Sequence, residues 1–182
     1  NFNYFNYIEK LNSFSSSFTQ HTYNEKGSLV KESNGVLLYK KKSKYILEYL
    51  SPNKIKFISD GALVTTLDID LDQAIIQSTN NKAQNNFFEI MTNKDEINKK
   101  FILKSYLYNN DNYVKFVPKN KELENNIFLL IIKDNKIKKI TFMNDFDQSV
   151  TMVFSDFKVN LDVLDSSFKI DIPENFDVII DK

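Results

Sequence analysis

Five consecutive residues, Lys40, Lys41, Lys42, Ser43 and Lys44, concentrate positive charge between two apolar runs. The flanking stretches, GVLLY and YILEYL, alternate as β-strands do, which places the charged segment at a turn. A lysine ammonium can donate three hydrogen bonds, so one of these side chains could hold a specific partner. A solvated hairpin turn accounts for the same pattern. Composition and periodicity alone leave both interpretations open.

Other residues capable of chemistry are sparse. Cysteine is absent, which excludes disulfides, thiolate metal sites and cysteine nucleophiles. His21 is the sole histidine and lies in the alternating stretch FTQHTY, so we predict a histidine on the surface of a strand. The three glycines form no phosphate-binding loop. We therefore expect no catalytic residue, no metal and no cofactor.

An acidic triplet, Asp68, Asp70 and Asp72, begins like a calcium-binding loop. Such a loop needs glycine at its sixth position and glutamate at its twelfth. Gln73 and Thr79 stand at those positions. We predict that the acidic triplet belongs to a solvated hairpin turn.

The chain as a whole carries no excess charge, because its 24 basic residues, all lysine, balance 24 acidic ones. Without a basic field we expect no nucleic-acid partner. A length of 182 residues suits a single domain spanning 1–182. The longest apolar run, IFLLII at 127–132, suits a strand and falls well short of the ~18–20 residues of a membrane helix. The opening NFNYFNY shows no signal peptide, and we take it as the start of a mature or trimmed chain.

Helical periodicity is confined to short segments. In residues 3–14 the apolar positions Tyr4, Tyr7, Ile8 and Leu11 follow the i, i+3, i+4, i+7 spacing of an amphipathic helix. The stretch 81–100 loses strand alternation, and its apolar residues predict one or two short helices. A helical turn is expected within 161–168.

Elsewhere the alternation has period 2, with turn signals such as NEKG, SDG and KDNK between the runs. About ten or eleven short strands are predicted, joined as an antiparallel meander. The apolar face of such a sheet must be covered, either by a second sheet in a sandwich or by curling into a barrel or half-barrel capped by helices. The 16 Phe and 9 Tyr residues either line an apolar cavity or fill a packed core.

Six stretches, in order along the chain, resemble the LolA family of periplasmic carriers of outer-membrane lipoproteins. They are LNSFSSSFTQ (11–20), SNGVLLYKKKSKYILEYLSP (33–52), ISDGALVTTLDIDLDQAII (58–76), VKFVPK (114–119), ITFMNDFDQSVTMVFSDFKVN (140–160) and FKIDIPENFDVI (168–179). The resemblance implies a mainly β (α+β) fold, an incomplete antiparallel β-barrel with a helical lid over a hydrophobic cavity.

The resemblance also implies a function without catalysis. A periplasmic carrier of this family takes acylated lipoproteins from an inner-membrane ABC transporter and delivers them to an outer-membrane acceptor. We expect the protein to act as a monomer. The competing hypotheses are a related periplasmic half-barrel that binds lipids or senses the state of the envelope, and an enzyme built on a β scaffold.

Site residues follow from the same resemblance. Aligned without a gap, Lys41 stands at a position where the family usually has an arginine that bonds lid carbonyls and holds the empty cavity shut. Lysine lacks the planar fork of arginine, so the exchange is not neutral. We expect Lys40, Lys42 and Lys44 to be solvated. Unless the turn resets strand parity, the expected cavity wall contains Phe18, Leu37, Tyr39, Tyr45, Leu47, Tyr49, Val64 and Phe142, and the expected lid contains Tyr4, Tyr7, Ile8, Leu11, Phe87, Phe88, Ile90 and Met91.

Overall fold

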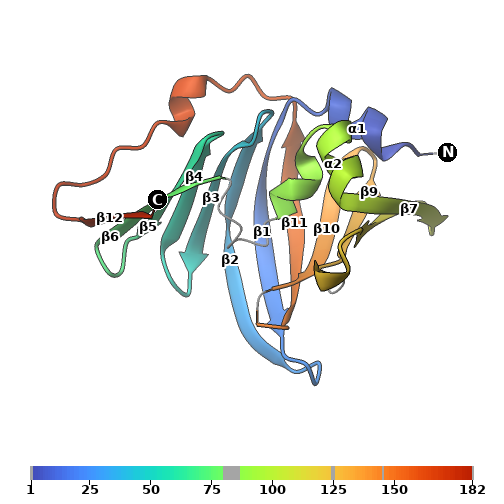
Figure 1. The fold of residues 1–182 in the computed structure, drawn as a ribbon, viewed down its shortest axis with the longest axis horizontal. Helices are drawn as coiled ribbons and strands as arrows, with labels where there is room; N and C mark the ends of the chain where they lie inside the picture. Colours follow the sequence, from blue (N-terminus) through green and yellow to red (C-terminus); the bar gives the residue numbers. More distant parts are fainter. Residues whose placement is uncertain (1, 80–86, 124–125, 145, 182) are drawn as a thin grey trace.

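A computed structural model describes residues 2–79, 87–123, 126–144 and 146–181. In these residues twelve strands form one sheet, which curls but does not close (Figure 1). Three short helices, Tyr4–Lys10, Phe87–Met91 and Lys94–Lys100, contribute residues to a core against one face of it. This open, curled sheet is the capped half-barrel of the two predicted architectures, so the predicted fold class is confirmed.

Strands that are consecutive in the chain are neighbours within β1–β6 and within β7–β11. The two groups join where β1 pairs with β11, and β12 pairs with β6 at the far edge. The order across the sheet is β12-β6-β5-β4-β3-β2-β1-β11-β10-β9-β8-β7. The bounds are β1 Ser13–Tyr23, β2 Leu29–Lys40, β3 Lys44–Ser51, β4 Ile55–Asp60, β5 Leu63–Asp68, β6 Gln73–Ser78, β7 Phe101–Tyr108, β8 Asp111–Pro118, β9 Phe128–Lys133, β10 Lys136–Met143, β11 Ser149–Val159 and β12 Asp177–Asp181.

The helices are short, as predicted. They are α1 Tyr4–Lys10, η1 Phe87–Met91, α2 Lys94–Lys100, η2 Lys121–Leu123 and η3 Asp165–Phe168. Asn3 and Asn93 cap α1 and α2 by accepting hydrogen bonds from backbone amides of the first turn. Helix α1 ends earlier than the apolar stripe suggests, because β1 begins at Ser13. Among the described residues no helix is long and apolar enough to cross a bilayer.

The face of the sheet that α1 and η1 cover is called the inner face here. Alternate residues of each strand point to it, and the register places Phe14, Tyr39 and Tyr45 side by side there on β1, β2 and β3. These side chains form one large buried cluster with α1, η1 and Ile97 of α2. The main core therefore lies between the inner face and the helices.

A second, smaller cluster lies on the opposite, outer face at one end of the sheet. Ile58, Leu67 and Ala74 pack there against Ile170, Ile172 and Phe176 of the segment that follows η3. This segment leads the chain from β11 to the far edge of the sheet, where β12 pairs in parallel with β6 (Figure 1). A hairpin meander predicts antiparallel pairs throughout, so this parallel twelfth strand differs from expectation: the chain reaches the far edge by a long connection instead of a turn.

Candidate functional site

The residues expected to line a cavity lie together on the inner face. They come from strands β1, β2, β3, β5 and β10. The pairing carries the same parity through the β2–β3 turn, since Tyr39 faces Tyr45 and Leu37 faces Leu47. We call them the wall: Phe18, Leu37, Tyr39, Tyr45, Leu47, Tyr49, Val64 and Phe142.

The wall has a covered part and a more open part. Phe18, Leu37, Tyr39, Tyr45 and Val64 are buried, with at most 6% of each residue exposed. The remaining three, Leu47, Tyr49 and Phe142, are half-buried and pack at the margin of the main core.

Tyr49 also has a polar contact, because its hydroxyl donates to Gln20 Oε1 at 2.7 Å. Burial raises the pKa of Tyr49 to about 12, so its hydroxyl stays protonated at neutral pH.

The residues expected to form a lid are all buried. We call α1 with Leu11, together with η1, the lid: Tyr4, Tyr7, Ile8, Leu11, Phe87, Phe88, Ile90 and Met91. Rings at both ends of the lid touch the sheet. Tyr4 meets Phe116 of β8 edge to face at a centroid distance of 4.9 Å, and Phe88 stacks on Tyr45 of β3 at 3.9 Å. The lid thus fills the space in front of the inner face with aromatic side chains.

Two tyrosine hydroxyls hold the end of η1. Tyr4 Oη donates to the carbonyl of Ile90 at 2.6 Å, and Tyr39 Oη donates to the carbonyl of Met91 at 2.8 Å. Burial raises the pKa of both tyrosines well above the ordinary value, so both hydroxyls remain donors. Tyr7 differs from them: its hydroxyl is buried and has no hydrogen-bond partner in the described structure.

The lysine run forms the turn between β2 and β3, and this turn is docked on the end of α1. Lys42 and Ser43 adopt left-handed backbone conformations, and Lys40 pairs with Lys44 across the strands. The backbone amide of Lys41 donates to the carbonyl of Asn12 at 2.9 Å. Its ammonium reaches back to α1 and donates to the carbonyl of Glu9. One lysine of the five-residue run is therefore directed at a lid carbonyl.

Comparison with known proteins gives the family. The family model described as outer membrane lipoprotein carrier protein LolA matches residues 9–171. The chain belongs to the LolA family. A relative from Francisella philomiragia subsp. philomiragia, named outer-membrane lipoprotein carrier protein, is 30% identical over 177 residues, covering 96% of this chain and 85% of the relative.

Solved structures share the LolA-like fold at low identity. A LolA superfamily protein from Nitrosomonas europaea superposes with a TM-score of 0.50 at 11% identity, covering 91% of this chain and 96% of that one. The MucA/MucB complex from Pseudomonas aeruginosa contains a chain with a TM-score of 0.50 at 12% identity, covering 92% of this chain and 58% of that one. These two likenesses describe the fold alone.

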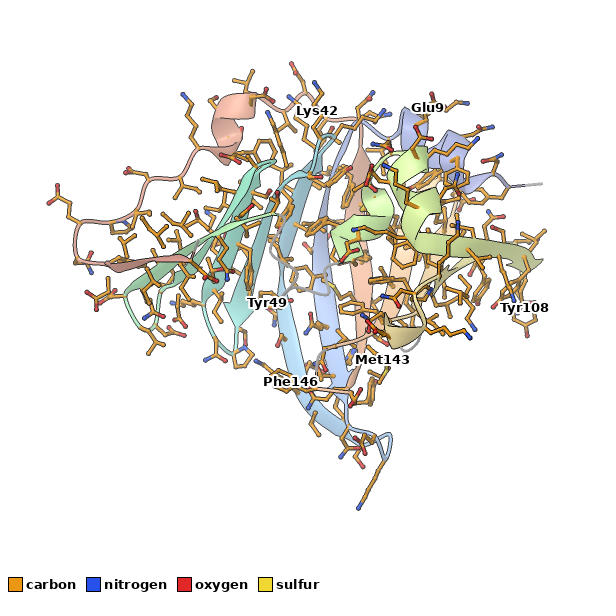
Figure 2. All side chains as sticks on the ribbon, in the orientation of Figure 1. Glu9, Lys42, Tyr49, Tyr108, Met143 and Phe146 are labelled. Carbon is orange, nitrogen blue, oxygen red and sulfur yellow. The ribbon has the colours of Figure 1, made fainter. Side chains whose placement is uncertain are left out.

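Two lysines of the run, expected to be solvated, are only partly exposed and have partners that the sequence did not predict. Lys40 and Lys44 lie on the outer face, where their ammonium groups pair with the carboxylate of Asp165 in η3 at 2.8 and 2.9 Å. Lys40 also donates to the carbonyl of Val163 at 2.6 Å. The sequence did not predict these partners because they come from the C-terminal segment of this LolA-family chain, more than a hundred residues away, which passes over the turn. Lys42 is exposed (Figure 2).

The other residues considered for chemistry have structural roles. His21 lies on β1 with Glu32 of β2 at 3.0 Å from its Nε2. Asp68 closes the β5–β6 turn by accepting hydrogen bonds from the amides of Asp70 and Leu71, both at 3.1 Å. Within the described residues no group of three or more histidine, cysteine or acidic side chains is placed to hold a metal.

Proposed function

We propose that this LolA-family chain is a periplasmic carrier that binds the acyl chains of lipoproteins and moves them between membranes. It would receive acylated lipoproteins released by an inner-membrane ABC transporter and deliver them to an acceptor at the outer membrane. The role needs binding and release, with no chemical step. The observation that carries the proposal is an aromatic inner face covered by a separate lid.

A removable lid answers a physical problem of such a carrier. At ~0.8 kcal/mol per methylene, burying about 45 methylenes of three acyl chains would release on the order of 35 kcal/mol. Non-covalent affinities saturate near roughly 20 kcal/mol, and a carrier must also release its cargo. A lid that packs on the same apolar surface opposes binding, since its contacts are lost on loading and regained on release.

We further propose that Lys41 latches the closed lid. Its ammonium holds the Glu9 carbonyl at the end of α1, and its backbone amide holds Asn12 just beyond. Carbonyls of the last helical turn lack partners within the helix, so a cation there is favourable. Lysine makes this hydrogen bond through a single nitrogen. Lys41 stands at the position where the family usually has the arginine that bonds lid carbonyls.

The carrier proposal is tested with the purified chain and inner-membrane vesicles that contain the lipoprotein-releasing transporter and a lipidated substrate. After addition of ATP, a carrier is expected to yield a soluble complex with the lipoprotein. A protein that binds a fluorescent fatty acid but yields no soluble lipoprotein complex would contradict the carrier role and favour a lipid-sensing module.

The latch is tested by Lys41→Leu. We expect a looser lid, so that the lipoprotein loads but is transferred poorly to outer-membrane acceptors. Lys42→Leu is the matched control, because Lys42 is exposed in the same turn. Lys41→Arg should retain transfer. Unchanged transfer by Lys41→Leu would remove Lys41 from the latch.

A further inference from the structure

We propose that Tyr4 and Tyr39 form a hydroxyl clasp that fastens η1 in the closed lid, separately from the bond that Lys41 makes to α1. The inference concerns lid closure and takes its biological meaning from the proposed carrier role. The closed lid is thus held at two places: the Lys41 ammonium holds α1, and the neutral hydroxyls of Tyr4 and Tyr39 hold η1.

The two hydroxyls converge on one short stretch of backbone from very different parts of the chain. Their acceptors are the consecutive carbonyls of Ile90 and Met91, at the end of η1. Tyr39 belongs to the wall on β2, so its bond ties η1 to the sheet. Tyr4 belongs to α1, so its bond ties η1 to the other lid element. When η1 leaves the sheet, either α1 moves with it or the Tyr4 bond breaks.

The surroundings make these bonds effective. Tyr4 and Tyr39 are 3% and 2% exposed, so water does not compete for the carbonyls in the closed state. A phenol brings a donor into this apolar layer without the desolvation penalty of an ammonium or a guanidinium. Its ring packs at the same time: Tyr4 lies edge-on to Phe116, and Tyr39 stacks on Phe14 at 5.1 Å.

Tyr7 lies in the same aromatic layer and provides a matched control for Tyr4. Tyr7, one turn along α1 from Tyr4, has a buried hydroxyl with no partner in the described residues. Tyr7→Phe and Tyr4→Phe each remove one hydroxyl oxygen from the aromatic layer. Only Tyr4→Phe also removes a hydrogen bond that the described structure contains. Comparing the phenylalanine variants of these two residues separates the bond from the packing.

The test measures hydrogen exchange of the backbone amides of η1 and α2 in the cargo-free full chain. Tyr4→Phe and Tyr39→Phe are each expected to raise the opening equilibrium of η1, and hence its exchange, by about tenfold, since each leaves a buried carbonyl unsatisfied. Tyr7→Phe should not raise it. Amides of β9, a strand that contributes neither a donor nor an acceptor to the clasp, serve as the internal reference and should keep their protection in all variants.

Equal exchange in wild type, Tyr4→Phe and Tyr39→Phe would overturn the clasp. So would a rise in Tyr7→Phe as large as in Tyr4→Phe, or an equal rise in β9, because either would show a general loss of packing. A second measurement, the rate at which a fluorescent palmitate analogue enters the protein, should rise in the same two variants. Lipoprotein transfer is assayed separately, so a failed carrier assay with an η1-specific rise in exchange would refute the carrier role and leave the clasp standing.

Discussion

At the scale of single residues, hydroxyl groups differ sharply in what burial does to them. Tyr4, Tyr39 and Tyr49 each donate one hydrogen bond from a buried or half-buried ring. The Tyr7 hydroxyl is buried without a partner among the described residues. A buried donor that loses its water without finding a protein acceptor destabilises the state that buries it by roughly 1–3 kcal/mol. Tyr7 therefore works against the closed lid, while Tyr4 and Tyr39 support it.

Replacing Tyr7 by phenylalanine is accordingly expected to stabilise the cargo-free protein. The free energy of unfolding should rise by about 1 kcal/mol, which for a chain of this size raises the melting temperature by roughly 2–4 °C. Tyr49→Phe is the opposite case, because it deletes the bond to Gln20, and should lower stability by about 1 kcal/mol. Thermal denaturation followed by circular dichroism compares the two. A lower melting temperature for Tyr7→Phe would show that its hydroxyl has an acceptor in solution.

Gly35 is a second residue whose identity follows from close contact. It lies on β2 opposite Phe18 of β1 and Tyr49 of β3, and a Cβ there would stand 2.0 Å from the carbonyl oxygen of Glu48 and 2.7 Å from the Phe18 ring. Gly35→Ala should therefore lower the free energy of unfolding by about 3 kcal/mol or more, the upper end for overpacking.

Gly27→Ala is the control for Gly35, because a Cβ at Gly27 would meet no described atom within 4 Å, although its φ is +77°. That change should lower stability by only about 1 kcal/mol. Urea denaturation of both variants measures the difference. Equal destabilisation would contradict the close contact at Gly35.

For single residues, the sequence predicts the sheet face to which a side chain points better than it predicts the hydrogen-bond partner of that side chain. Period-2 parity is enough to direct Tyr39 and Tyr45 inward, because side-chain direction follows from local backbone geometry. Lys41 is singled out by the resemblance to the LolA family. The acceptors of Tyr4 and Tyr39 are 86 and 52 residues away along the chain. Such pairs depend on how η1 docks on the sheet, which no local pattern contains.

At the scale of elements, runs bounded by clear turn signals are predicted well and the C-terminal segment is not. The hairpins from β1 to β6 coincide with alternating runs, which are separated by Gly, Pro or Asp except at the lysine turn between β2 and β3. Strand β12 is a short run, DVIID, whose partner β6 lies about a hundred residues earlier. Its placement depends on the outer-face cluster of Ile170, Ile172 and Phe176, and on η3. The ion pairs of Asp165 with Lys40 and Lys44 belong to the same long-range arrangement.

These ion pairs predict a local dependence on pH. The two ammonium groups lower the pKa of Asp165 to about 2, below the ordinary value of 3.8. A carboxylate with a lowered folded-state pKa stabilises the folded state above about pH 4, and that contribution is lost as the pH falls toward 2. The attachment of η3 should therefore weaken across this interval.

Lys40→Met should raise the pKa of Asp165 toward 3.8, which an NMR titration of its side-chain carboxyl carbon measures. Lys42→Met is the matched control, because Lys42 is exposed in the same turn, whereas the ion pairs of Asp165 are with Lys40 and Lys44. A titration midpoint of Asp165 that is the same in Lys40→Met and wild type would contradict the ion pair.

At the scale of the whole molecule, the proposed carrier function makes the lid and the cargo competitors for one apolar surface. Such competition would explain why composition could not decide between a packed core and a ligand cavity. The same Phe and Tyr residues form a packed core when the lid covers them, and would form a binding surface when it leaves. The apparent affinity for an acyl chain is then the intrinsic affinity of the wall reduced by the small fraction of molecules whose lid is open.

Lid and wall substitutions should consequently shift acyl binding in opposite directions. Phe88→Ala removes the ring that stacks on Tyr45, and truncation of a buried phenylalanine typically destabilises its state by about 3–5 kcal/mol. Because the closed lid loses this contact, the apparent Kd for a fluorescent palmitate analogue should fall by at least about tenfold. Leu47→Ala removes apolar area from the wall and should raise that Kd by about fivefold, which corresponds to roughly 1 kcal/mol.

Ile58→Ala, in the smaller cluster on the outer face, controls for general loss of stability and should leave the Kd within about twofold of wild type, because Ile58 lies on the face opposite the lid and the wall. Fluorescence titration of the three variants at equal protein concentration gives the Kd values. If Phe88→Ala weakened binding as Leu47→Ala does, Phe88 would belong to the surface that holds the acyl chain. The lid would then move with its cargo instead of being displaced by it, and closure would accompany loading.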